Sequence, residues 1–335
     1  MKKVRMVKNR VLIAIVCAVS LLTVGCGKNV ELDNTYDVSK TSYTSGSTNF
    51  NFFAKDLCVT DDFNFGTEST TSQVAEGAGA FNVDEEEVIY AQNIFEKLYP
   101  ASTTKIMTVL LVMEAISTGQ LSLDTPIMVS PTALAGVPSD ASHVNPRLKA
   151  GEVMNVLTLL QCVMMESDCH ACNVLAEAVA GSVDNFVAMM NAKAAALGCT
   201  ETNFVNTSGY PENNHYSNAY SLFLITKEAM KYPVFENIIA MTEVVIPATN
   251  LSEARKLETT NALIKASEYY NPYAIGGKTG SSSSSGLCFV SVARKGEKTV
   301  ITVVLGAATN TMSDGTRKKQ QFSETNKLIQ IGLAG

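Results

Sequence analysis

Three segments of this 335-residue chain differ in how apolar and polar positions follow one another. Residues 11–24 are almost uniformly apolar, whereas residues 27–75 are rich in Ser, Thr and Asn and have no regular period. Beyond that stretch, apolar positions recur at helical and strand spacings between turns that contain Gly, Pro and Asn. These changes predict a signal segment over residues 1–25, a solvated tether over residues 26–75 and one folded domain over residues 76–335.

The folded segment has strand patterns at both ends and helical patterns between them. Alternating apolar runs on either side of Asp84–Glu87 predict a hairpin, and the two strands that flank Arg294–Lys298 predict another. Asn155 can cap one helix, Ser167 and Asp168 are both good N-caps for the next, and Gly119 ends an earlier apolar helix. This order predicts an α+β fold, in which an antiparallel sheet is flanked by helices and carries an inserted, mainly helical lobe.

The N-terminal segment has the features of an export signal. Five basic residues come first, and the apolar run that follows is too short and wrongly flanked for an ordinary transmembrane helix. The run ends in Leu-Thr-Val-Gly before Cys26, which resembles a bacterial lipobox. We therefore expect a lipid on Cys26 to anchor the protein to the cell membrane, outside the cytoplasm. Plain secretion or an uncleaved anchor would also place the domain outside the cytoplasm.

Composition limits the partners of the mature chain. Without the five basic residues of the signal, 21 of the 26 Lys and Arg residues remain against 32 Asp and Glu, a net charge of −11. Phosphate contacts need clustered Lys and Arg, and the mature sequence has no such cluster, so we expect no nucleic-acid partner. Six cysteines remain after Cys17 and Cys26, which permits disulfides in an exported protein but assigns no pair.

Ser102 and Lys105 stand three residues apart in PASTTKIMT, at the start of the first apolar helix. Residues at this spacing share a helix face, so the Lys105 amine can lie against the Ser102 hydroxyl. A neighbouring base makes a serine nucleophilic, and a lysine can be that base when burial or a second cation lowers its pKa. The pair predicts a serine nucleophile in a dry site, although this spacing is common enough to be weak evidence alone.

The segment GGKTG, residues 276–280, precedes a strong strand pattern and could supply the second cation. Lys278 would provide the charge and Thr279 a hydroxyl, while Gly280 lacks a side chain that would block close approach. The edge of such a strand can take an extended peptide as an added strand. The alternative is an ordinary glycine-rich turn with a solvated lysine.

The segment ESDCHAC, residues 166–172, has two interpretations. Two cysteines with a histidine between them suggest a metal or redox site, but a structural zinc site needs four well-spaced ligands and no second C-x-x-C follows. We therefore expect no metal here, and we favour buried thiols or one incidental disulfide. Neither His143 nor His215 has a sequence neighbour that suggests a catalytic triad, so both are expected at the surface or in hydrogen-bonded loops.

Under the second interpretation, Ser167 belongs with the two other motifs. Together the three resemble the S-x-x-K, S-x-N and K-T-G set of penicillin-binding proteins and serine β-lactamases. The flanking segments LYPASTTKIMT, NTSGYPENNHYSNAYSL and GGKTG are similar to the low-molecular-mass D-alanyl-D-alanine carboxypeptidases, over about residues 76–330. The resemblance implies the fold of the DD-peptidase and β-lactamase superfamily, a stem peptide ending in D-Ala-D-Ala as substrate, and acylation by β-lactams. It implies no metal and no organic cofactor.

The resemblance also implies a role for each matching residue. Ser102 would be acylated with Lys105 as general base, and Ser167 would relay a proton to the leaving D-Ala. The backbone N–H groups of Ser102 and Ser281 would stabilise the oxyanion. The implied catalytic residues are Ser102, Lys105, Ser167 and Lys278, and the implied substrate-binding residues are Cys169, Thr279, Gly280 and Ser281. Among these, Lys278 and Thr279 would hold the terminal carboxylate of the peptide.

Two positions depart from the family pattern: Cys169 stands where Asn is expected, and Ser221 stands where Asp is usual. A thiol donates and accepts hydrogen bonds weakly, so Cys169 should cost on the order of 1–3 kcal/mol and slow turnover by tens- to hundreds-fold. The leading prediction is a membrane-tethered D-Ala-D-Ala carboxypeptidase. One alternative is a diverged domain that binds peptidoglycan or β-lactams without turnover. A β-lactamase is another, although no convincing Glu-x-x-x-Asn loop lies between Ser167 and Lys278.

Overall fold

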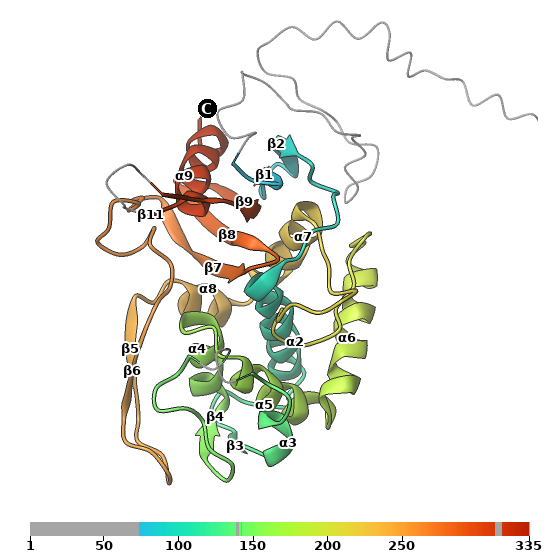
Figure 1. The fold of residues 1–335 in the computed structure, drawn as a ribbon, viewed down its shortest axis with the longest axis vertical. Coiled ribbons are helices and arrows are strands. Elements are labelled where there is room, and N and C mark those ends of the chain that lie inside the picture. The colour runs from blue at the N-terminus through green and yellow to red at the C-terminus, as the bar shows by residue number, and fades with distance from the viewer. Residues whose placement is uncertain (1–73, 139–140, 142, 312–316, 335) are drawn as a thin grey trace, which may run out of the picture. The chain divides into compact units, whose positions relative to one another are not determined.

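The computed structural model describes residues 74–138, 141, 143–311 and 317–334. The predicted signal segment, Cys26 and nearly all of the predicted tether lie outside these residues. The described part contains a five-stranded antiparallel sheet in the order β2-β1-β9-β8-β7 (Figure 1). Its strands are β1 (Gly77–Asn82), β2 (Glu87–Gln92), β7 (Ala274–Ser282), β8 (Gly286–Lys295) and β9 (Lys298–Ala307). Both predicted hairpins are present, since β1 pairs with β2 and β8 pairs with β9.

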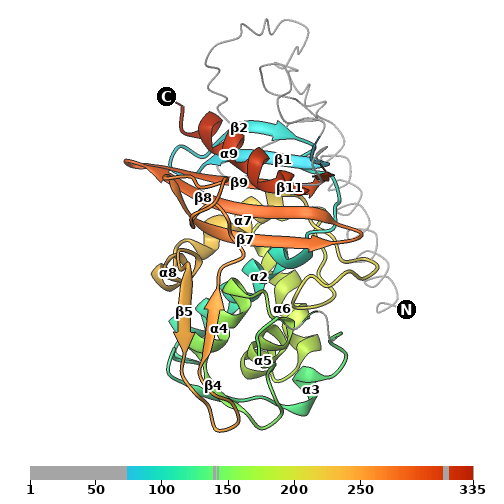
Figure 2. The ribbon, with the colours of Figure 1, turned by 60° about the vertical axis from the view of Figure 1, so that its left-hand side comes forward.

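Helices cover both faces of this sheet, which explains why β8 and β9 are apolar on both sides. Helix α9 (Gln320–Gly332) packs on one face, across β9, β8 and β1. Helix α7 (Ala219–Ala229) packs on the other face, mainly against β9 (Figure 2). Strand β7 is the edge strand on the side of the helical lobe, and it runs past the top of that lobe.

The helical lobe is the chain segment between β2 and β7, so the predicted insertion is confirmed. Its helices are η2 (Ala101–Thr104), α2 (Lys105–Ser117), α3 (Pro131–Leu134), α4 (Val156–Met165), α5 (Cys169–Ala180), α6 (Val183–Ala196), α7 and α8 (Pro233–Ile239). Helix α2 is buried along almost its whole length and packs against α4, α5, α6, α7 and α8. Small antiparallel pairs complete the fold: β3 (Pro126–Met128) with β4 (Val153–Asn155), β5 (Glu243–Ile246) with β6 (Arg255–Glu258), and β10 (Thr309–Thr311) with β11 (Arg317–Lys319).

Asn155 caps α4 as predicted, and of the two candidates Ser167 and Asp168 it is Asp168 that caps α5. The Asn155 carboxamide oxygen accepts the Thr158 N–H at 2.8 Å, and the Asp168 carboxylate accepts the Ala171 N–H at 2.9 Å. Each cap satisfies an amide that the first helical turn leaves without a partner. The Asp168 cap fixes the start of α5 directly after Ser167, one of the predicted catalytic residues.

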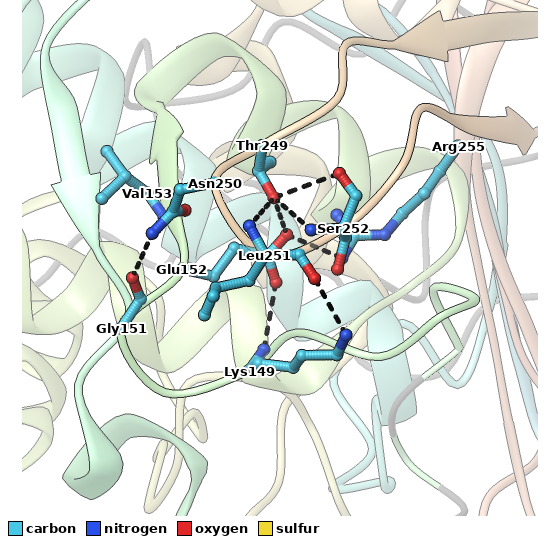
Figure 3. A network of polar contacts seen from close by, with 9 residues as sticks. All are labelled: Lys149, Gly151, Glu152, Val153, Thr249, Asn250, Leu251, Ser252 and Arg255. Atoms are coloured by element: carbon cyan, nitrogen blue, oxygen red, sulfur yellow. Dashed lines mark hydrogen bonds and ion pairs between the residues drawn. The ribbon is translucent and has the colours of Figure 1, made fainter.

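A buried ion pair ties the β5–β6 hairpin to the rest of the lobe (Figure 3). Arg255 Nη2 donates to Glu152 Oε1 at 2.7 Å, and both side chains are fully buried. Thr249 Oγ1 donates to the same oxygen at 2.8 Å, and the Asn250 side chain bonds the backbone of the 151–153 segment. The sequence pattern did not indicate this hairpin. Beyond it the chain leads to Thr260, at the cleft described next.

Candidate active site

An open cleft of about 420 Å³ lies between the edge strand β7 and the helical lobe. Residues from all three sequence motifs line it: Ser102, Ser167, Cys169, Thr279, Gly280 and Ser281. Its other wall residues include His143, Glu166, Tyr210, Pro211 and Thr260. Elements that are far apart in the sequence therefore meet at one solvent-accessible site.

Lys105 is fully buried and directs its amine at the Ser102 hydroxyl. The Nζ–Oγ distance is 2.9 Å, which is a hydrogen bond. The same amine donates to the backbone oxygen of Ser208 at 2.7 Å and weakly to Cys169 Sγ at 3.4 Å. Ser102 itself lies in the 3₁₀ turn η2 rather than in α2, but the three-residue spacing still brings the two side chains together. A neutral amine at this place can take the serine proton.

Ser167 has a strained backbone and an unengaged hydroxyl. Its φ of +61° lies in the left-handed region, which non-glycine residues seldom adopt. Its Oγ makes no hydrogen bond to any residue that the structure describes, although the side chain lines the cleft. The second carboxylate oxygen of Asp168 accepts the backbone N–H groups of His143 and Val144, at 3.0 and 3.2 Å. This aspartate therefore joins the 143–144 loop to the corner that presents Ser167.

Burial alternates along β7, so Lys278 and Gly280 face the interior while Thr279 faces the cleft. Lys278 is fully buried and lies behind the cleft wall, where its Nζ donates to the Thr279 backbone oxygen at 3.0 Å. Burial and the neighbouring Lys105 lower the pKa of Lys278 to about 7. The neighbouring ammonium group of Lys105 and the lack of water make the protonated form of Lys278 costly here.

Gly280 allows β7 to approach the nucleophile. A Cβ atom at this position would lie 2.9 Å from the Ser102 backbone nitrogen and 3.0 Å from the Ala101 Cβ. This close contact explains why a residue without a side chain is needed at position 280. The close approach places the Ser102 N–H against Gly280, and Ser281, the second predicted donor of the oxyanion site, follows Gly280 in the strand and lines the same cleft.

Sequence reasoning missed the contribution of the 203–217 loop. Its Ser208 carbonyl holds the Lys105 amine, and its Thr207 carbonyl accepts Thr108 Oγ1. His215 Nδ1 accepts the Val205 N–H at 3.2 Å, so its Nε2 carries the hydrogen that bonds a threonine of η2 at 2.9 Å. Burial and Lys105 lower the pKa of His215 to about 4, which keeps it neutral. The prediction that His215 lies in a hydrogen-bonded loop is confirmed. The contact between the Ser208 carbonyl and Lys105 could not be predicted, because any residue has a backbone carbonyl.

The prediction of buried thiols is also confirmed. The free, buried cysteines are Cys162, Cys169, Cys172, Cys199 and Cys288. Burial raises the pKa of Cys199 to about 12 and that of Cys288 to about 11, so both are protonated at neutral pH. Within residues 74–138, 141, 143–311 and 317–334, no three His, Cys, Asp or Glu side chains gather as a metal site would require. None of the helices in the same ranges combines the length and apolarity needed to cross a bilayer.

Comparisons with known proteins agree with this geometry. The family described as D-alanyl-D-alanine carboxypeptidase matches residues 66–309. D-alanyl-D-alanine carboxypeptidase DacF of Bacillus subtilis is 34% identical over 266 residues, which cover 79% of this chain and 64% of that protein. The chain thus spans less than two thirds of the length of DacF, and 58% of the length of DacC of Escherichia coli.

Solved structures show the same fold. The crystal structure of the Streptomyces K15 DD-transpeptidase aligns with a TM-score of 0.69 and 27% identity, over 81% of this chain and 100% of that one. Penicillin-binding protein D2 from Listeria monocytogenes, in its cefotaxime-bound form, aligns with a TM-score of 0.65 and 27% identity, over 78% of this chain and 97% of that one. With the family match and the shared fold, the chain belongs to the D-alanyl-D-alanine carboxypeptidase family.

Proposed function

We propose that this protein is a serine D-alanyl-D-alanine carboxypeptidase that removes the terminal D-Ala from peptidoglycan stem peptides and is acylated by β-lactams. The observation that carries the proposal is the hydrogen bond between the buried Lys105 amine and the Ser102 hydroxyl, at 2.9 Å in an open cleft. Its membership of the family supports the substrate class. The Listeria relative has been solved with cefotaxime and with ampicillin, which supports acylation by β-lactams.

In the proposed reaction, Ser102 Oγ attacks the carbonyl carbon of the penultimate D-Ala while its proton passes to Lys105. The backbone N–H groups of Ser102 and Ser281 stabilise the oxyanion, which is typically worth ~10²–10³ in rate per donor. The proton then moves through Ser167, whose hydroxyl is unengaged, to the amine of the leaving D-Ala. Water hydrolyses the ester and restores the serine.

The terminal carboxylate would lie against Thr279, with Lys278 acting from behind it. Thr279 is at the cleft surface, where its Oγ1 is 2.6 Å from Thr260 Oγ1. Lys278 is buried beneath that surface. When it is protonated, its positive charge would attract the carboxylate through the strand. We therefore give Lys278 an electrostatic role rather than direct contact.

Cys169 favours a second candidate, a penicillin-binding domain with little or no turnover. Its thiol is a weak partner for Lys105 at 3.4 Å. Two observations favour turnover. The Streptomyces K15 DD-transpeptidase has a serine followed two positions later by a cysteine, as its solved variants show. The other departure, Ser221, donates to the Thr200 carbonyl at 3.1 Å and is not part of the cleft.

One experiment separates these functions. The purified protein is incubated with a fluorescent penicillin and, separately, with a pentapeptide that ends in D-Ala-D-Ala. Stable labelling with release of D-Ala supports the carboxypeptidase, whereas labelling without release supports the second candidate. Rapid hydrolysis of the penicillin would indicate a β-lactamase instead. If Ser102→Ala labels as strongly as the wild type, the assignment of the nucleophile is wrong.

We further propose that the protein works outside the cytoplasm, held at the membrane by a lipid on Cys26. The basic segment, the apolar run and the cysteine after Gly25 support this location. Replacement of Cys26 tests lipid anchoring independently of export. Cys26→Ser should abolish incorporation of labelled fatty acid and release the protein from washed membranes. Unchanged membrane retention without the thiol would contradict lipid anchoring.

A further inference from the structure

The two cysteines of the segment ESDCHAC belong to the first turn of α5, and the proposed reaction does not use them as a pair. Cys169 lines the cleft and keeps 5% of its surface exposed, whereas Cys172, one turn further along the helix, is fully buried. A small reagent in the cleft can therefore reach the first sulfur directly. In thiol oxidation, an accessible thiol reacts first and a second thiol beside it completes the disulfide.

The helix places the two cysteines within reach of a disulfide. Cα atoms three residues apart in an α-helix are about 5 Å apart, and disulfides span Cα distances of about 4.4–6.8 Å. Cys172 Sγ donates to the Asp168 carbonyl at 3.3 Å, and Cys169 Sγ is 4.0 Å from the carbonyl oxygen of Ser167. Both sulfurs thus lie beside successive carbonyls at the start of α5. Burial raises the pKa of Cys172, and Lys105 and Cys169 are the next strongest influences on it.

The other described cysteines have different surroundings. Burial raises the pKa of Cys162 in α4, and Asp168 and Arg255 are the next strongest influences on it. Cys199 and Cys288 lie outside α4 and α5, and each of their thiols donates to a backbone carbonyl. Among the cysteines that the structure describes, the two of α5 are therefore the pair that combines access from the cleft with a neighbouring thiol.

Hydrogen peroxide is an oxidant small enough to enter the cleft, which has a volume of about 420 Å³. The sulfur of Cys169 attacks one peroxide oxygen, the O–O bond breaks, and a sulfenic acid and one water form. The sulfur of Cys172 then attacks that of Cys169, the S–O bond breaks, and the hydroxyl group leaves as a second water with the thiol proton. The two thiols lose two electrons and two protons, which the peroxide takes up. The N-terminal end of α5 stabilises the thiolate that begins this reaction.

We propose that Cys169 and Cys172 are an oxidation site, at which peroxide forms a disulfide that slows acylation of Ser102. In the reduced protein, Cys169 Sγ lies 3.4 Å from the Lys105 amine. The disulfide would draw this sulfur toward Cys172 and remove the contact, in the helical turn that begins just after Ser167. Loss of one weak hydrogen bond should slow labelling by a fluorescent penicillin about two- to tenfold. The effect on acylation rests on the proposed function, whereas formation of the disulfide does not.

The test uses the purified protein, which is reduced with dithiothreitol, freed of this reagent and treated with hydrogen peroxide. Remaining thiols are alkylated with iodoacetamide, and the chain is cleaved after glutamate. Cleavage at Glu166 and Glu177 releases residues 167–177, which contain these two cysteines and no other. In the wild type, this peptide should be lighter by two hydrogen atoms than its reduced form and should carry no alkyl group. Penicillin labelling should fall about two- to tenfold and return after dithiothreitol is added.

Two variants identify the partner of Cys169. In Cys172→Ala the disulfide should not form, because the resolving thiol is gone. Cys162→Ala is the matched control, since it removes an equally buried thiol from the neighbouring helix α4. This control should form the disulfide as the wild type does.

Alkylation of both cysteines after peroxide treatment would overturn the proposal, and so would a covalent link from Cys169 to Lys105 in place of the disulfide. A disulfide that leaves penicillin labelling unchanged would also overturn it. Failure of the proposed function gives a different result, because the reduced wild type is then not labelled at all. In that case the mass of the 167–177 peptide still decides whether the oxidation site exists.

Discussion

Replacing Cys169 by asparagine should raise catalytic activity. In the structure, the Lys105 amine has a good acceptor in the Ser208 carbonyl at 2.7 Å but a poor one in Cys169 Sγ at 3.4 Å. A carboxamide would give the amine a strong acceptor and could also donate to the amide of the substrate. Hydrogen bonds to charged groups contribute about 1.5–3 kcal/mol, and 1.4 kcal/mol is about tenfold in rate. Cys169→Asn should therefore raise kcat/KM by about 10- to 100-fold.

The assay for this prediction is release of D-Ala from a D-Ala-D-Ala pentapeptide. Cys169→Ala is the matched control, because it removes the thiol without adding a carboxamide and should not exceed the wild type. Penicillin labelling of Ser102 in each variant shows that the site is folded. An unchanged or lower kcat/KM in a stably folded Cys169→Asn protein would refute the reasoning. Such a result would mean that the Lys105 amine needs no acceptor beyond the Ser208 carbonyl and the Ser102 hydroxyl.

Three further predictions follow from the same geometry. Gly280→Ala should slow penicillin labelling at least about tenfold, because the new Cβ would lie 2.9 Å from a backbone nitrogen of the nucleophile turn. With the pKa of Lys278 lowered to about 7, the labelling rate should change as pH passes through neutrality, and Lys278→Gln should remove this step because the titrating group is gone. Glu152→Gln should cost roughly 3–5 kcal/mol in urea unfolding, because it leaves a fully buried arginine unpaired.

Each of these predictions has a result that would contradict it. Normal penicillin labelling of Gly280→Ala would mean that β7 and η2 can move apart without changing the geometry around Ser102. A pH profile that is identical in Lys278→Gln would show that Lys278 is not the group that titrates near neutral pH. Glu152→Gln with wild-type stability would mean that Arg255 reaches solvent. The lowered pKa of Lys278 also has a stability consequence: the unfolded lysine binds a proton that the buried one releases, so stability should rise between about pH 7 and 10.5.

Local signals in the sequence predicted much of the fold. Asn155 was predicted as an N-cap because its short polar side chain bonds an amide of the next turn, and Asp168 does the same at the break where Ser167 and Asp168 were both candidates. The turn at Arg294–Lys298 was predicted because apolar runs flank it, and β8 pairs with β9 across it. These features depend on neighbours in the sequence, so the sequence contains the information that specifies them.

Features that depend on distant partners were not predicted. The β5–β6 hairpin has no strong apolar alternation, and much of what holds it comes from Glu152, about one hundred residues earlier. The Ser208 carbonyl binds Lys105 through the backbone, so its side chain gives no hint of the contact. The cleft likewise arises only when β7 and the helical lobe come together. Motif spacing could identify the reacting groups but not the walls around them.

The strained residues of the active site indicate how much of its geometry exists before a substrate binds. Ala101 and Ser167 have φ values of +47° and +61°, and each stands beside or at a predicted catalytic serine. Such conformations cost about 1–3 kcal/mol each and persist only where packing holds them. The turn at Gly209 packs so closely on Ala101 that a Cβ there would lie 1.8 Å from its carbonyl oxygen. Asp168 holds Ser167 through the cap of α5.

None of these constraints involves the side chain at position 169. The carbonyl of Ser208, the cap by Asp168 and the approach of β7 at Gly280 position the two serines and the two lysines whether a thiol or a carboxamide follows. Catalysis that rests on prearranged donors and a prearranged base should lose one interaction, not its geometry, when that group is weak. A thiol at position 169 should therefore slow turnover at this site rather than abolish its chemistry.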